Sequence, residues 1–250
     1  MLSVRRVLLF VLLSAPLAVP AADVRVAVAS NFAPTLKRLA ADFTAQTGHR
    51  VLISSGSTGK HYAQIRNGAR FDLFMAADSE RPALLEREGI GVAGSRFVYA
   101  EGRLVLWAPA AASLANPRDL LASGTLTRLA IANPRLAPYG LAARELLSGW
   151  GLWQGLQGRL VRGENVGQAF QFVATGNAPA GLVALSQVLE HDASARGAYQ
   201  VIEAGLHPPI RQQALLLHRS PAAEALVRFL KGAPALATIR TAGYAVPGDA

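Results

Sequence analysis

The 250-residue sequence contains no cysteine, and this absence excludes several kinds of protein. Without thiols the chain forms no disulfide and offers no thiolate to a metal ion. It also lacks the cysteine that carries the lipid of a bacterial lipoprotein. The fold must therefore rest on an apolar core, for which a hydrophobic content of 51% is ample.

Sequence motifs of common enzyme classes are also missing. There is no Gly-x-Ser-x-Gly nucleophile elbow, no His-Glu-x-x-His zinc motif, no phosphate-binding loop ending in Gly-Lys-Ser/Thr and no dinucleotide-binding Gly-x-Gly-x-x-Gly. The five histidines share no metal-ligand spacing; they are His49, His61, His191, His207 and His218. We therefore expect neither a catalytic nor a metal-ligating cluster.

Two carboxylates, Asp72 and Asp78, are the best candidates for a catalytic pair, because they flank one predicted strand. Such a pair could supply general acid and base catalysis. We expect structural roles for both instead, since Asp78 can cap a helix that starts over residues 79–81 and Asp72 begins the strand. An exported hydrolase of a phosphate or sulfate ester, with one of these carboxylates as its base, is kept as an alternative.

Residues 1–21 are predicted to be a signal peptide. Arg5 and Arg6 precede an apolar stretch over 7–13, and Val19-Pro-Ala21 has the small residues of a cleavage site. The apolar stretch is well short of the roughly 20 residues that cross a bilayer, which favours a cleaved signal over a membrane anchor. We expect export to the periplasm with cleavage near Ala21.

The formal net charge is +9, of which Arg5 and Arg6 contribute two. A basic protein suits an anionic partner. The arginines and lysines are scattered singly, without the basic runs and interleaved aromatic residues of nucleic-acid-binding surfaces. Export argues against the same partner, so we expect no nucleic acid and regard a solvated basic surface as the simplest explanation of the charge.

Hydrophobic periodicity after the signal alternates between strand and helix. Strands are predicted at 24–29, 51–54 and 71–77, and helices at 33–47 and 61–67, each helix being followed closely by a glycine. This βαβαβ order implies a parallel sheet with right-handed crossovers.

The same architecture appears a second time further along the chain. Its strands are predicted at 103–108, 129–132, 160–162 and 181–185, with helices over 141–148 and from about 166 to 175. A strand at 213–218 and a helix at 222–231 follow, the helix capped by Ser220 with Pro221 in its first turn. The apolar strands at 103–108 and 213–218 flank this second unit, and we predict that the chain crosses there between two α/β lobes. The first lobe would comprise residues 22–104 and 208–250, and the second residues 105–207. Each lobe is expected to be a mainly parallel sheet flanked by helices.

Four short polar segments, at 30–31, 56–59, 138–140 and 164–166, follow predicted strands and precede predicted helices. The carboxyl ends of parallel strands are where open α/β sheets bind ligands. Each helix start offers unpaired backbone N–H groups and about half a positive charge. One such segment is typical of an ordinary helix cap. Four at equivalent positions in two units indicate a cleft that could hold a small tetrahedral dianion with neutral donors.

These segments resemble the molybdate-binding proteins of bacterial molybdate ABC importers. The resemblance runs through nearly the whole chain after the signal. It rests on Ala29-Ser-Asn-Phe32, Ile53-Ser-Ser-Gly-Ser-Thr-Gly59, Phe71-Asp-Leu-Phe-Met-Ala-Ala-Asp78, Ala137-Pro-Tyr-Gly-Leu-Ala142, Glu164-Asn-Val-Gly-Gln-Ala169, and Lys231-Gly with Ala242-Gly-Tyr244.

The resemblance implies a type II periplasmic binding protein, whose two lobes close on molybdate or tungstate and deliver it to a membrane permease. It places oxyanion contacts on Ser30, Asn31, Thr58, Tyr139 and Val166. Ser30 and Thr58 would use hydroxyl and backbone donors, and Asn31 its backbone or amide N–H. Tyr139 would use its backbone N–H or its hydroxyl, and Val166 its backbone N–H. The same resemblance implies a monomer without catalytic activity, without a cofactor and without direct metal ligands.

This sequence departs from one branch of that family and follows another. The first branch has Ala-Ser-Leu, a run of serines and a later tyrosine, where this chain has Asn31, Ser-Gly-Ser-Thr-Gly and Val183-Ala-Leu185. The second branch has Thr-Asn and Ser-Gly-Ser-Ser-Gly, so the hydroxyl donors are kept, but Thr58 adds a methyl group that bears on cavity size. Binding of sulfate or thiosulfate is therefore a close alternative, and an exported scaffold without a ligand is a more distant one.

Overall fold

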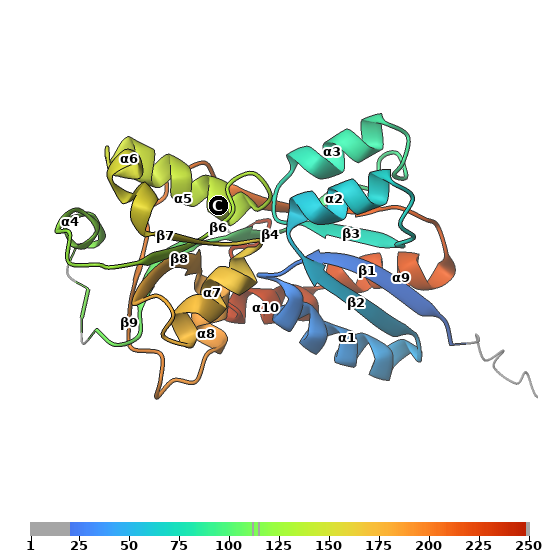
Figure 1. Ribbon diagram of the computed structural model, residues 1–250. Helices are drawn as coiled ribbons and strands as arrows, with labels where there is room; N and C mark the ends of the chain where they lie inside the picture. Colours follow the sequence, from blue (N-terminus) through green and yellow to red (C-terminus); the bar gives the residue numbers. More distant parts are fainter. Residues whose placement is uncertain (1–20, 112, 115, 249–250) are drawn as a thin grey trace, which may run out of the picture.

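The computed structural model describes residues 21–111, 113–114 and 116–248 (Figure 1). The predicted signal peptide, apart from Ala21, lies outside these residues. Within the described ranges, no helix combines the length and the apolar character needed to cross a membrane. The chain forms two five-stranded sheets that lie next to each other, each with helices on its faces (Figure 1).

The first sheet has the strand order β2-β1-β3-β10-β4. Its strands are β1 (Asp23–Ala29), β2 (Arg50–Gly56), β3 (Leu73–Ala76), β4 (Phe97–Gly102) and β10 (Ile210–Leu216). The β1 strand pairs in parallel with β2 and β3, as the βαβαβ pattern predicted. The β10 strand is antiparallel to both of its neighbours, so it alone opposes the other four.

The second sheet repeats this plan with the order β7-β6-β8-β5-β9. Its strands are β5 (Leu104–Ala108), β6 (Leu129–Ala132), β7 (Leu160–Gly163), β8 (Ala180–Ala184) and β9 (Ala198–Val201). Here β6 is parallel to β7 and β8, whereas β5 is antiparallel to β8 and β9. Both sheets are therefore mainly parallel, as predicted.

Helices cover both faces of the first sheet. One core joins it to α1 (Ala33–Thr47), α9 (Pro221–Leu230) and α10 (Ala233–Thr241), and a smaller core joins its other face to α2 (Thr58–Arg66) and α3 (Glu80–Arg87) (Figure 1). A third core belongs to the second sheet. Its helices are α4 (Pro117–Ala122), α5 (Pro138–Gly149), α6 (Trp153–Leu156), the 3-10 turn η1 (Gln157–Arg159), α7 (Val166–Ala174) and α8 (Leu185–Glu190).

The α1 helix shows how the sequence determines these elements. Leu36, Leu39 and Phe43 recur at helical spacing and are fully buried against the first sheet. Gly48 ends the helix with a φ of 74°, a left-handed conformation that a residue with a Cβ rarely adopts. The predicted bounds of this helix, 33–47, agree with the structure.

The chain passes between the sheets twice. The first crossing is the single residue Arg103, between β4 and β5, and the second is the segment 202–209, between β9 and β10. The predicted strands at 103–108 and 213–218 correspond to β5 and β10, which adjoin these crossings. Two predicted helix starts were late: α2 begins at Thr58 rather than at residue 61, and α5 begins at Pro138 rather than at residue 141. These earlier starts place Thr58 and Tyr139 within the first turns of their helices.

Candidate functional site

All five predicted contact residues line one cavity between the two sheets. Ser30 and Asn31 lie in the segment before α1, and Thr58, Tyr139 and Val166 lie in the first turns of α2, α5 and α7; all five are among its lining residues. The cavity is small, with a volume of about 10 Å³. None of the described residues that line it carries a charge. An anion there would meet only neutral donors.

The segment before α1 contributes one hydroxyl and one free backbone N–H. The N–H of Ser30 is paired with the Gly56 carbonyl at 2.9 Å, whereas that of Asn31 has no acceptor among the described residues. The Asn31 side-chain amide makes its hydrogen bonds with other residues of the protein. Its Nδ2 donates to Gln212 Oε1 at 3.0 Å and to the Tyr244 hydroxyl at 3.1 Å. Of the two donors predicted for Asn31, the backbone N–H is the one that is available.

The start of α2 contributes Thr58. Ser57 precedes it as the N-cap, with its Oγ accepting a hydrogen bond from the Lys60 N–H at 3.3 Å. The Thr58 Oγ1 accepts one from the Ala77 N–H at 3.0 Å, which fixes the hydroxyl and leaves its hydrogen free to donate. The Thr58 N–H is one of the helix-start donors and has no acceptor in the described part of the chain.

The second sheet contributes two backbone donors. Val166 is the first residue of α7, after the N-cap Asn165, and Tyr139 is the second residue of α5, after Pro138. The N–H groups of Val166 and Tyr139 find no acceptor among the described residues. Four free N–H groups, three in the first turns of α2, α5 and α7 and one just before α1, therefore belong to residues that line the cavity.

The Tyr139 hydroxyl lies elsewhere. It is close to Gly102 and Gln212, and neither of these residues lines the cavity. Burial raises the pKa of this hydroxyl well above its ordinary value, and the neighbouring Tyr244 adds to the shift, so the group stays protonated. Of the two donors predicted for Tyr139, the hydroxyl therefore lies beside residues outside the cavity lining, which leaves the backbone N–H as the candidate donor.

Contacts between the two halves of the molecule close the cavity. The Gly59 N–H donates to the Leu136 carbonyl at 2.8 Å, and the Gly167 N–H donates to Ser30 Oγ at 3.1 Å. Farther out, Arg38 pairs with Glu190 at 2.7 Å. Residues of the two halves thus contact each other around the site, and we refer to this arrangement as closed.

The two carboxylates that the hydrolase alternative would use accept hydrogen bonds from backbone N–H groups instead. Asp72 Oδ2 accepts a hydrogen bond from the Arg25 N–H at 2.7 Å, and Asp78 Oδ1 accepts one from the Arg81 N–H at 3.0 Å. Burial raises the pKa of Asp78, and an ion pair with Arg81 opposes that shift. Neither carboxylate lines the cavity. Both have the structural roles that were expected.

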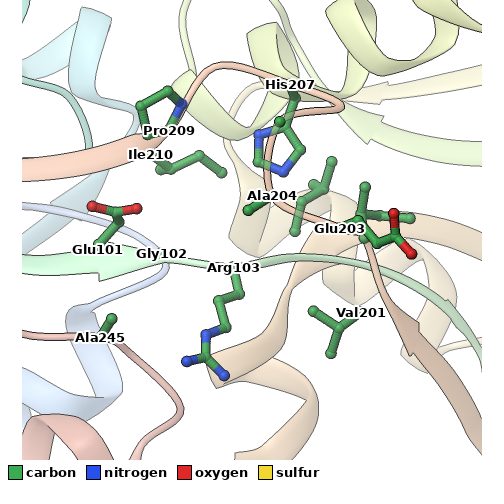
Figure 2. Close-up of a pocket in the computed structure, with 13 residues that line it drawn as sticks. Glu101, Gly102, Arg103, Val201, Glu203, Ala204, His207, Pro209, Ile210 and Ala245 are labelled. Carbon is green, nitrogen blue, oxygen red and sulfur yellow. The ribbon is translucent and has the colours of Figure 1, made fainter. Parts of the chain in front are cut away.

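A larger cavity of about 700 Å³ lies where the chain crosses between the sheets, and it contains none of the predicted contact residues (Figure 2). Arg103 of the first crossing and Pro209 of the second border it, together with Glu101 and Gly102 at the end of β4 and Ile210 at the start of β10 (Figure 2).

A group of buried polar side chains behind the small cavity was not predicted. Gln212 is fully buried, and Tyr99, Tyr244 and Ser186 are nearly so. The Tyr244 hydroxyl donates to the Asn31 carbonyl at 2.8 Å and contacts Ser186 Oγ at 2.8 Å. The available signal was the pair of polar residues Gln212 and Gln213, of which Gln213 begins the predicted strand at 213–218 and Gln212 directly precedes it.

Comparisons with known proteins agree with the family resemblance seen in the sequence. The family model described as bacterial extracellular solute-binding protein matches residues 24–245. The molybdate-binding protein ModA of Azotobacter vinelandii is 46% identical over 230 residues, 91% of each chain, and that of Rhodobacter capsulatus is 42% identical over 233 residues, again 91% of each. The solved structure of the Azotobacter vinelandii periplasmic molybdate-binding protein superimposes with a TM-score of 0.85 and 41% identity, covering 90% of this chain and 99% of that one.

Proposed function

Because this chain belongs to the family of bacterial extracellular solute-binding proteins, in the branch that includes ModA, we propose that it binds molybdate in the small cavity between its lobes. Its relatives are binding proteins, so the chain is a binding protein rather than an enzyme, and it carries no cofactor. We further propose that it binds tungstate, acts as a monomer in the periplasm and delivers the anion to the permease of an ABC importer.

One observation carries the proposal. Four unpaired backbone N–H groups, on Asn31, Thr58, Tyr139 and Val166, surround one small uncharged cavity. Buried N–H groups are seldom left without an acceptor, and an oxyanion accepts several hydrogen bonds at once. The hydroxyls of Ser30 and Thr58 complete the proposed contacts.

The proposed lobes comprise residues 22–103 and 208–250 in the first and 104–207 in the second; the predicted boundary at 104 moves by one residue because Leu104 begins β5 of the second sheet. Donors from both lobes would contact one anion, so binding should favour the closed arrangement. Fixed backbone donors also support selectivity, because an anion of the wrong size leaves some of them unpaired.

Calorimetry with the full chain, titrated separately with molybdate, tungstate, sulfate and phosphate, tests the ligand. We expect tight binding of molybdate and tungstate and much weaker binding of the other two. Sulfate binding as tightly as molybdate would refute the assignment, and so would the absence of any molybdate signal in both calorimetry and thermal unfolding.

A substitution of Val166 tests the proposed contact itself. Val166→Pro removes the N–H at the first residue of α7, a position where proline is well tolerated in helices. The preceding Asn165 has an extended backbone with φ −141° and ψ 171°, which proline also allows. A hydrogen bond to a charged group contributes about 1.5–3 kcal/mol, so molybdate affinity should fall by at least about tenfold.

Val166→Ala is the matched control, because it shortens the same side chain and keeps the N–H. Val166→Ala should keep most of the molybdate affinity that Val166→Pro loses. Equal affinities of the two variants would show that the Val166 N–H does not contact the anion.

A further inference from the structure

Behind the anion cavity, one buried side chain lies between the two halves of the proposed site. Gln212 is fully buried, and the pairing of β10 with β4 shifts register between Gln212 and Gln213. Such a bulge redirects a side chain and is common beside functional sites. Here it accompanies a Gln212 side chain that faces the interior next to the chain crossing.

The two ends of the Gln212 amide have different neighbours. Its Oε1 accepts a hydrogen bond from Asn31 Nδ2 at 3.0 Å and lies 3.0 Å from the Tyr99 hydroxyl, both in the first lobe. Its Nε2 is on the side of Tyr139, which belongs to the second lobe. Neither Nε2 nor the Tyr139 hydroxyl has a hydrogen-bond partner in the described part of the chain, although both are buried.

The absence of a side chain at Gly102 leaves room for the Tyr139 hydroxyl and Gln212 Nε2 beside its backbone. A Cβ at Gly102 would lie 2.1 Å from the Tyr139 hydroxyl oxygen and 2.8 Å from Gln212 Nε2. Gly102 is the last residue of β4, immediately before the crossing residue Arg103, and Ile210, the first residue of β10, lies near by (Figure 2). Its φ is not in the left-handed region, so the backbone itself would accept alanine.

We propose that Gln212 is a positioning residue for anion binding, which sets the distance between the two halves of the site by holding Asn31 and meeting the Tyr139 side chain over Gly102. This inference rests on the proposed function. Asn31 and Tyr139 each offer a backbone N–H to the cavity, one from each lobe. A side chain that is hydrogen-bonded to Asn31 and lies beside Gly102 with the Tyr139 hydroxyl would therefore set how far apart those donors are when the lobes are closed.

The first test is a steric substitution and its reversal. Gly102→Ala should lower molybdate affinity at least tenfold in calorimetry, because its Cβ collides with the Tyr139 hydroxyl. Adding Tyr139→Phe removes the atom at 2.1 Å and keeps the backbone N–H of residue 139. The double variant should recover several-fold of the loss relative to Gly102→Ala, with Tyr139→Phe alone completing the double-mutant cycle. Independent, additive effects of the two substitutions would overturn the proposal.

The second test separates positioning from stability. Gln212→Met removes both polar ends at similar length, and the readout is the ratio of sulfate to molybdate dissociation constants. A positioning residue should change this ratio several-fold, since a shifted spacing suits anions of different size unequally. Equal losses for both anions, or none, would indicate a structural role and overturn the proposal.

The unmodified protein in the same titrations keeps the two hypotheses distinct. If it bound no oxyanion, the proposed function would fail and this inference with it. If it bound molybdate while the cycle was additive and the ratio unchanged, only this inference would fail.

Discussion

Gly59→Ala should weaken anion binding while leaving the anion-free protein as stable as before, or more so. Gly59 is the second residue of α2, and alanine is about 0.5–1 kcal/mol more favourable than glycine within a helix. In the closed arrangement, however, its Cβ would lie 2.9 Å from the Leu136 carbonyl oxygen and 3.1 Å from the Leu136 Cα. These are backbone atoms of the opposite lobe, which cannot rotate away.

The Gly59→Ala substitution should therefore destabilise only the closed arrangement of the lobes. Overpacking of this kind costs typically about 1–3 kcal/mol, which corresponds to a loss of molybdate affinity of about 5- to 150-fold. Calorimetry measures the affinity, and thermal unfolding without anion measures the stability. The molybdate affinity should fall while the stability without anion stays the same or rises. A general disturbance of the fold would lower both.

Gly149→Ala is the matched control. Gly149 is the exposed last residue of α5, and a Cβ there would meet nothing within 4 Å. This variant should bind molybdate as the unmodified protein does. The reasoning would be refuted if Gly59→Ala also kept its affinity within twofold, or if its melting temperature without anion fell clearly.

Three further predictions concern single side chains. Thr58→Val should cost about 1–3 kcal/mol of stability in urea unfolding, because the buried Ala77 N–H loses its acceptor, whereas Thr58→Ser should keep most of it. Burial lowers the pKa of His61, so the unfolded chain takes up a proton more readily than the folded one. The stability of the folded protein should therefore fall as the pH drops through the unfolded-state pKa of about 6.5. His61→Gln should flatten this pH dependence in urea unfolding measured at pH 5 and 7.5. Glu190→Gln removes the ion pair with Arg38, and since exposed pairs contribute about 0.2–1 kcal/mol, affinity should drop by no more than about fivefold; a loss above tenfold in calorimetry would contradict this.

The fold was predictable where the hydrophobic pattern was strong. The helix at 33–47 and the three parallel strands of the first sheet were predicted, and the resemblance to molybdate-binding proteins is confirmed by relatives that cover 91% of the chain. The strands β4 and β9 were not predicted. Both lie at the edge of a sheet and are only partly buried, so their sequences lack the continuous apolar run of a central strand.

Which atoms of the site face the cavity could not be predicted from sequence. Asn31 presents only its backbone because its amide is bound by Gln212 and Tyr244, which are 181 and 213 residues away in sequence. Tyr139 presents its N–H because α5 begins at Pro138 and its hydroxyl packs at Gly102. These outcomes depend on contacts between distant segments, to which local periodicity gives no access.

The charge that attracts an anion and the groups that would hold it are separate on this molecule. The formal net charge is +9, yet the described residues that line the cavity are all uncharged. Four helix starts, each with about half a positive charge, together present about two, which matches a dianion such as molybdate. A lysine or arginine in the cavity would add attraction for any anion, whatever its shape. Backbone donors held by four helices attract only where their geometry is met, so the same charge is supplied in a form that can discriminate between anions by size.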